Sequence, residues 1–152
     1  MSEANRLNFC KTNLNAKIPT RSTEDSVGYD LFTPNEIIIH PDESPKEIDT
    51  GIAMEMYGEY FGYIRSKSRI AKSYPDLFLK AGVIDPGYRG SIKVLFYNKG
   101  KNDIIFNAGD AIAQLLFIPV YLPELVEVSK IDDKTQRGRR GFGQVYYDSL
   151  NK

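Results

Sequence analysis

The amino-acid sequence predicts an all-β domain, folded as a sandwich, a barrel or a jelly roll of short strands, with one short helix. Short runs of β-branched and aromatic residues recur along the chain, separated by Gly, Pro, Asn and Asp. Apolar residues at helical spacing are almost absent. The chain has 152 residues, which is the size of a single domain. About eight or more short strands must therefore close around one core.

The expected elements follow from these runs and from the turn residues between them. Residues 48–56 alternate between apolar and mostly polar side chains, which is typical of a strand with one buried face. Only residues 68–73 can hold a helical turn or two. The remaining expected strands cover residues 36–40, 60–65, 77–84, 91–97, 103–106, 111–120 and 125–128.

The stretch from Ala81 to Gly90 contains the strongest turn signal. An apolar run ends at Asp85, and Pro86-Gly87 follows at once; proline fixes φ near about −65° and glycine accepts a positive φ. We expect residues 77–84 and 91–97 to pair as a hairpin around this turn. An aspartate here often does no more than cap the turn, but its carboxylate can also orient a water molecule.

Composition excludes several classes of protein. The 20 basic and 20 acidic residues balance, which argues against nucleic acid or a membrane surface as a partner. Cys10 and His40 are the only residues of their types, so a disulfide framework and a Cys/His zinc site are excluded. The sequence shows no signal peptide and no run approaching a membrane span. We expect an intracellular protein, cytoplasmic or nuclear.

The composition changes near the C-terminus. From Lys130 onward the chain is polar, basic and rich in glycine. We expect residues 1–129 to form the β domain and residues 130–152 to be a mobile arm.

Five segments resemble, in order, the motifs of the dUTPase family, whose members split dUTP into dUMP and pyrophosphate. Gly28-Tyr29-Asp30-Leu31-Phe32 is similar to the first motif, and Val83-Ile84-Asp85 followed by Tyr88-Arg89-Gly90 is similar to the third. Each segment alone could be an ordinary capped turn. Together they run in the family's order from Gly28 to Gly143, which is most of the chain.

The second motif, usually Arg-Ser-Gly-Leu-Ala, can be placed in two registers. One begins at Arg65-Ser66, and the other is Lys67-Ser68-Arg69-Ile70-Ala71. We prefer the second, because it keeps the cation, the serine, the apolar residue and the alanine in step; Arg69 then replaces the usual glycine. A cation and a hydroxyl at a helix start suit an anion, and the alternative is a solvated basic loop.

The fourth motif, usually Gly-Asp-Arg-Ile-Ala-Gln-Leu, resembles residues 109–115, with Ala111 in place of the arginine. One cation or its salt bridge is thereby lost. Gln114 shares a strand face with Ile112 and Leu116, so its amide needs hydrogen-bond partners. Those partners are the phosphates or their supporting loop, or else the bond is purely structural.

The fifth motif resembles Arg137-Gly138-Arg139-Arg140-Gly141-Phe142-Gly143. Gln144-Val145-Tyr146 follow where the family has Ser-Thr, so hydroxyls that meet the γ-phosphate are missing. Glycines let backbone amides approach a phosphate, and Phe142 can stack on a planar base. An RGG-like arm that binds single-stranded nucleic acid has the same ingredients.

The resemblance implies a jelly roll assembled as a homotrimer, with active sites shared between neighbouring chains. Asp85 would orient or deprotonate a water that attacks the α-phosphorus of dUTP, and Asp30 would support the phosphate site. The backbone of residues 82–84 would read uracil, Tyr88 would pack on the deoxyribose, and Phe142 would cover the base. Mg²⁺ would be bound mainly through the substrate phosphates, with no metal ligand from the protein. The substrate-binding residues would be Lys67, Ser68, Arg69, Gly82, Val83, Ile84, Tyr88, Lys93, Gln114, Arg137, Phe142 and Gly143.

The implied activity supplies dUMP and limits uracil in DNA. Three alternatives remain open from the sequence. The departures at Arg69, at Ala111 and after Gly143 are compatible with a catalytically weakened regulator that keeps the fold. The basic arm is compatible with a nucleic-acid-binding protein, and the same superfold includes deaminases that act on dCTP.

Overall fold

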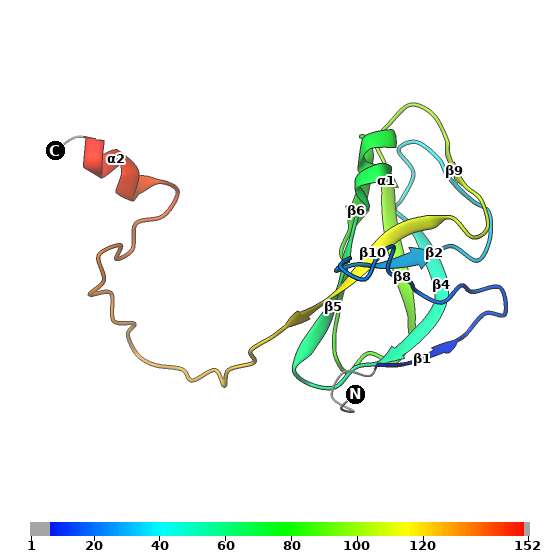
Figure 1. Ribbon diagram of the computed structural model, residues 1–152. Coiled ribbons are helices and arrows are strands. Elements are labelled where there is room, and N and C mark those ends of the chain that lie inside the picture. Colours follow the sequence, from blue (N-terminus) through cyan, green and yellow to red (C-terminus); the bar gives the residue numbers. More distant parts are fainter. Residues whose placement is uncertain (1–6, 151–152) are drawn as a thin grey trace. The chain divides into compact units, whose positions relative to one another are not determined.

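The computed structural model describes residues 7–150 and divides the chain into two compact units, residues 1–121 and 122–152 (Figure 1). In the described part, the first unit holds ten strands and the helix α1 (Ser68–Ser73), and the second unit holds the helix α2 (Gln144–Leu150). The predicted all-β class and the short helix at residues 68–73 are confirmed. No helix among the described residues is long and apolar enough to cross a membrane.

The first unit contains two four-stranded antiparallel sheets and a two-stranded ribbon. The first sheet has the order β1 (Asn8–Lys11), β4 (Lys46–Glu55), β8 (Ser91–Asn98), β6 (Leu77–Lys80). The second has the order β2 (Tyr29–Phe32), β10 (Ala111–Pro119), β5 (Tyr60–Arg65), β7 (Val83–Ile84). The ribbon pairs β3 (Ile37–Ile39) with β9 (Ile104–Phe106). This arrangement of two antiparallel sheets is the jelly-roll-like fold that was expected.

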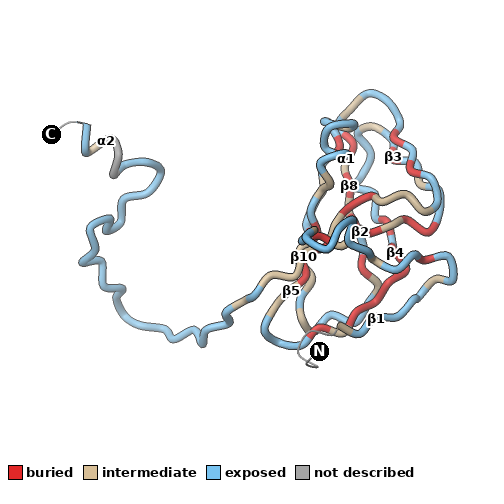
Figure 2. The backbone as a smooth tube through the Cα atoms, in the orientation of Figure 1, coloured by how far each residue is buried: buried red, intermediate tan, exposed pale blue. Residues whose placement is uncertain are grey.

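A single hydrophobic core joins the two sheets, and Figure 2 shows the buried segments on the inner side of both. Every second residue of β8 is buried, from Ile92 through Val94 and Phe96 to Asn98, as expected of a strand with one face in the core. Leu31 and Leu115 contribute from the other sheet and are fully buried. The core fixes the register of β2 and β10, the two strands that border the candidate site described below.

The expected pairing of residues 77–84 with residues 91–97 is confirmed for residues 77–80 and wrong for residues 83–84. The first run is not one strand: Ala81 and Gly82 have φ values of 57° and 124° and turn the chain out of the first sheet. β6 pairs with β8, whereas β7 crosses to the second sheet and pairs with β5. A Cβ atom on Gly82 would lie 2.8 Å from the Ile64 carbonyl oxygen, so this crossing requires glycine.

Two other expectations fail, for different reasons. Residues 125–128 form no strand and are exposed, because residues 122–150 offer no strand for them to pair with. β4 does not alternate beyond Thr50, because a bulge between Asp49 and Ala53 shifts its register against β8 and β1 pairs with its other edge. The strand β1 and the helix α2 were not predicted.

Candidate active site

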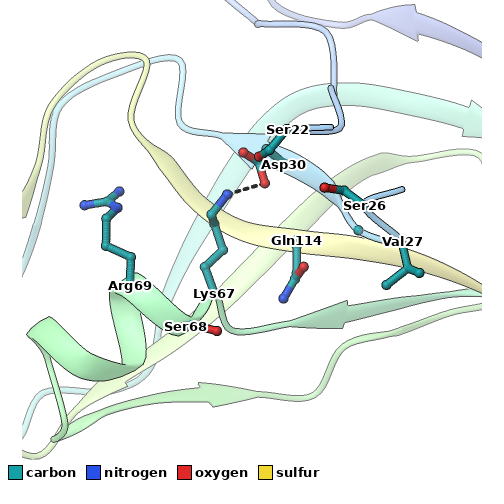
Figure 3. Close-up of a pocket in the computed structure, with 9 residues that line it drawn as sticks. Ser22, Ser26, Val27, Asp30, Lys67, Ser68, Arg69 and Gln114 are labelled. Carbon is teal, nitrogen blue, oxygen red and sulfur yellow. Dashed lines mark hydrogen bonds and ion pairs between the residues drawn. The ribbon is translucent and has the colours of Figure 1, made fainter. Parts of the chain in front are cut away.

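A pocket of about 320 Å³ opens at the edge of the second sheet, where the start of α1 meets β2 and β10 (Figure 3). Its walls carry two cations, Lys67 and Arg69, and one carboxylate, Asp30. Hydroxyl groups and the Gln114 amide complete the polar lining. A concave site with several cations and hydroxyls suits a phosphate-bearing ligand.

Lys67 forms an ion pair with Asp30 inside this pocket. The Lys67 side chain is 19% exposed and that of Asp30 is 16% exposed, so the pair is largely withdrawn from solvent. Lys67 is also the N-cap residue of α1, and its carbonyl oxygen accepts the first helical hydrogen bond from the Ala71 N–H at 2.9 Å. The pair therefore fixes the start of α1 against β2.

Gln114 connects β10 to the loop that precedes α1. Its Nε2 donates a hydrogen bond to the carbonyl oxygen of Ser66 at 3.1 Å. The Gln114 side chain packs directly over Gly28: a Cβ atom on this glycine would lie 2.2 Å from the Gln114 Oε1 atom. Position 28 therefore requires glycine because the Gln114 side chain lies so close to its backbone, and not because of a positive φ.

Arg69 reaches from α1 to β10, where its guanidinium donates to the Ala111 carbonyl oxygen at 3.3 Å. Arg65 is engaged elsewhere: its guanidinium donates to the Tyr63 hydroxyl at 3.1 Å and lies 5.4 Å from the centre of that ring. Since Lys67, Ser68 and Arg69 line the pocket and Arg65 does not, the geometry favours the second register of the second motif.

Three pocket residues were not singled out from the sequence: Ser22, Ser26 and Val27. They lie on the loop before β2, which Arg21 braces by stacking its guanidinium 5.7 Å from the centre of the Tyr29 ring. The several serine and threonine residues just before the first motif were the only sequence feature that could have indicated this part of the pocket. Their approach to the pocket depends on how this loop folds.

Asp85 lies outside this pocket, on the connection from β7 to β8. Its backbone oxygen accepts the Tyr88 N–H at 3.0 Å, so the turn at Pro86-Gly87 is formed as predicted. The carboxylate is exposed and has no hydrogen-bond or ion-pair partner among residues 7–150. It is therefore free to accept hydrogen bonds from water.

Arg89 holds the turn that carries Asp85, a role that the sequence did not reveal. Its guanidinium donates to the carbonyl oxygens of Pro86 at 2.6 Å, Tyr88 at 3.1 Å and Met56 at 3.2 Å. Three backbone acceptors on two segments fix the turn against the end of β4.

The other residues expected at the nucleobase lie around this turn. Gly82 is buried, Val83 is exposed and Ile84 is half-buried, while the Tyr88 hydroxyl donates to the Ser91 carbonyl oxygen at 2.9 Å. Lys93 forms an ion pair with Glu47 at 2.7 Å, and this partner raises the pKa of Lys93. Lys93 is thus already engaged across β8 and β4.

The second unit carries the fifth motif. The Arg137 Nε donates to the Arg140 carbonyl oxygen at 2.9 Å, while the Arg140 guanidinium forms an ion pair with Asp148 of α2 at 3.2 Å. Phe142 is fully exposed, with a φ of 47°, and Gly143 follows with a φ of 80°. The aromatic ring of Phe142 is available for a partner or a ligand.

Comparison with known proteins gives a consistent result. The dUTPase family model matches residues 14–145. A curated relative from Monkeypox virus, named deoxyuridine 5'-triphosphate nucleotidohydrolase, is 41% identical over 137 residues, which is 90% of this chain and 88% of the relative. The protein of the same name from Vaccinia virus (strain Copenhagen) is 40% identical and covers 90% of each chain.

Solved structures of phage proteins share the fold. The dUTPase of Staphylococcus bacteriophage 80alpha, solved with dUPNHPP, superimposes with a TM-score of 0.84 at 26% identity over 91% of this chain and 97% of its own. A dUTPase variant from phage phi11 of S. aureus, whose structure describes a coordinated structural Mg(II) ion, has a TM-score of 0.77 at 26% identity. It covers 83% of this chain and 98% of its own.

Proposed function

This chain belongs to the dUTPase family and hydrolyses dUTP to dUMP and pyrophosphate, and we propose that two separate parts of its surface divide the work. The pocket beside α1 holds the phosphates, and the turn at Asp85 supplies the group that activates water. The names of the viral relatives favour hydrolysis over a purely regulatory role.

The phosphates bind to Lys67, Ser68 and Arg69. A triphosphate is strongly anionic, and charge-assisted hydrogen bonds to Lys and Arg are stronger than neutral ones. Asp30 acts indirectly, because its ion pair with Lys67 sets where that ammonium stands. Gln114 holds the Ser66 carbonyl and thereby the loop that leads into the phosphate-binding residues. This proposal rests on one observation: Lys67, Ser68 and Arg69 line the same pocket.

Asp85 orients or deprotonates the water that attacks the α-phosphorus, with pyrophosphate as the leaving group. Its carboxylate is exposed and unpaired among the described residues, so it can accept a hydrogen bond from water without first breaking another. The contacts of Arg89 keep the turn, and with it Asp85, in one geometry. A water molecule held in line with the leaving group by a fixed carboxylate reacts over a lower barrier.

The uracil base is read by the backbone of residues 82–84. β7 is an edge strand, so one row of its N–H and C=O groups is unpaired within the sheet and can bond to the base. Tyr88 packs on the deoxyribose. The uracil slot is the narrow space along the backbone of residues 82–84; Lys93 borders it, and it rejects the methyl group of thymine.

The complete site is shared between chains of a homotrimer. Asp85 is not part of the pocket that holds Lys67 and Arg69, so a neighbouring chain is expected to bring it to the bound nucleotide. A second observation supports an assembly: large apolar side chains from Tyr121 to Ile131 are exposed, Leu125 by 92%. Such a stretch needs a partner surface, and another copy of the chain provides one.

The C-terminal arm closes the site. Arg137 adds charge to the phosphates, the backbone of Gly143 approaches them, and Phe142 covers the base. The full exposure of Phe142 supports this proposal, because no residue of its own unit, among residues 122–150, shields its ring.

The pocket would receive Mg²⁺ together with the nucleotide. Among residues 7–150, no three His, Cys, Asp or Glu side chains gather as a metal site, and Asp30 in the pocket is already paired with Lys67. These residues fit an ion whose ligands are phosphate oxygens and water. When bound, the ion neutralises phosphate charge.

The test is pyrophosphate release in the presence of Mg²⁺ from dUTP, dTTP, dCTP and UTP. We expect rapid release from dUTP alone. Equal release from dTTP would contradict the uracil slot, and conversion of dCTP with release of ammonia would assign the chain to the deaminase branch.

A further inference from the structure

We propose that Arg69 replaces the cation that the fourth motif lacks in this chain, and that it is the pocket residue that recruits the triphosphate. The fourth motif of the family has an arginine where this chain has Ala111, and the second motif has a glycine where this chain has Arg69. The structure brings these two departures together. The inference rests on the proposed function of the pocket.

The contact between the two positions is direct. The Arg69 guanidinium donates to the carbonyl oxygen of Ala111 at 3.3 Å, although the residues are 42 apart in the sequence. Figure 3 shows Arg69 and Lys67 rising from the start of α1 toward the same side. A cation therefore contacts the backbone of residue 111, and it belongs to α1 and not to β10.

The two departures depend on each other. An arginine at position 111 would add a second positive charge at the residue whose carbonyl oxygen Arg69 contacts, and like charges close together repel each other. Ala111 is half-buried and ends at its Cβ atom, so it leaves the approach to its own carbonyl oxygen open. Arg69 and a small residue at position 111 thus form a matched pair.

Charge compensation separates Arg69 from Lys67. The Lys67 ammonium is already paired with Asp30, so part of its charge is neutralised before any ligand arrives. Among residues 7–150, the only bond of the Arg69 side chain is to a neutral carbonyl oxygen. A guanidinium has five N–H donors, so most of them remain for phosphate oxygens. Arg69 is therefore the pocket cation with uncompensated charge.

The two cations should respond differently to removal. Loss of Lys67 would leave the Asp30 carboxylate largely buried without its partner, and so would disturb the folded pocket. Loss of Arg69 removes an exposed side chain and one weak bond to a carbonyl. Its effect should appear in nucleotide affinity and not in stability.

A four-protein cycle tests the exchange: the wild type, Arg69→Ala, Ala111→Arg and the double variant. The measurement is the dissociation constant of a non-hydrolysable dUTP analogue with Mg²⁺, together with the thermal unfolding temperature. We expect Arg69→Ala to weaken binding by about 10- to 100-fold, the range for a hydrogen bond to a charged group. Adding Ala111→Arg to that variant should restore most of the loss. Ala111→Arg alone should bind no better than the wild type.

Lys72→Ala is the matched control, because Lys72 is an exposed cation in the last turn of the same helix and does not line the pocket. It should leave the dissociation constant unchanged. If the wild type binds the analogue and the Arg69→Ala variant binds it with the same dissociation constant, this inference is overturned and the proposed function is not. A double variant that is folded and as weak as Arg69→Ala would overturn this inference too. A wild-type protein that does not bind the analogue would overturn the proposed function as well.

Discussion

Substitution of Gly28 by alanine tests how tightly the pocket is packed. The new Cβ atom would stand 2.2 Å from the Gln114 Oε1 atom, so the Gln114 amide must swing away. Its hydrogen bond to the Ser66 carbonyl oxygen is then lost. Leaving a buried polar group unsatisfied costs about 1–3 kcal/mol, which corresponds to a loss of about 5- to 140-fold in an equilibrium constant, and this partly buried bond falls toward the lower end. We expect Gly28→Ala to weaken nucleotide binding within this range.

The assay is titration of each variant with a non-hydrolysable dUTP analogue, performed as a double-mutant cycle with Gln114→Ala. Because Gln114→Ala removes both the clash and the same hydrogen bond, the double variant should bind about as well as Gln114→Ala alone. Wild-type affinity in Gly28→Ala would refute the reasoning. Independent, additive losses would also refute it, since the two residues would then act separately.

Three further predictions concern other parts of the chain. Asp85→Asn should abolish turnover and leave nucleotide affinity largely intact; near-normal turnover would remove Asp85 from the chemistry. Deletion of residues 135–152 should slow hydrolysis greatly and leave the thermal unfolding of the β domain unchanged, whereas unchanged kinetics would exclude the arm from the mechanism. Asp103, 2.8 Å from His40, raises the pKa of that histidine, so their pairing stabilises the fold below the unfolded pKa of about 6.5. This stability is lost as the pH rises through the folded pKa. His40→Gln should therefore reduce the change of the unfolding temperature with pH over that window. A pH profile identical to that of the wild type would contradict a stabilising role of the His40–Asp103 pair.

The strands were predictable where turn residues mark both ends of an alternating run. β5 coincides with the expected residues 60–65, and β10 differs from residues 111–120 by one position. The crossing from β6 to β7 was not predictable, because Ala81 adopts a positive φ that alanine rarely takes. Pairing of β7 with β5, a tertiary interaction, imposes this conformation.

The C-terminal region shows the limits of local pattern more plainly. Residues 125–128 have strand-like composition, but a strand also requires a neighbour that residues 122–150 do not supply. The helix α2 contains β-branched and aromatic residues of modest helix propensity. Its Asp148 accepts a hydrogen bond from Gln144 at 2.8 Å and pairs with Arg140, and these side-chain contacts support the turn.

At the site, the motifs predicted which residues of α1, β2 and β10 meet, and the structure places Asp30, Lys67, Ser68, Arg69 and Gln114 around one pocket. The motifs could not reveal that Arg69 contacts the backbone of Ala111, because that contact depends on how α1 packs on β10. The role of Arg89 was hidden for the same reason, since Met56 is distant in the sequence.

In the proposed mechanism, Asp85 of one chain acts on a nucleotide held in the pocket of another. Its most direct test mixes two inactive variants, Asp85→Asn and Lys67→Ala, by co-refolding them at equal amounts. In a randomly assembled trimer with shared sites, about a quarter of the sites would combine an intact pocket with an intact aspartate. We therefore expect dUTP hydrolysis to return to about that fraction of the wild-type rate. A mixture that stays as inactive as its two components, although mixed trimers are present, would contradict it.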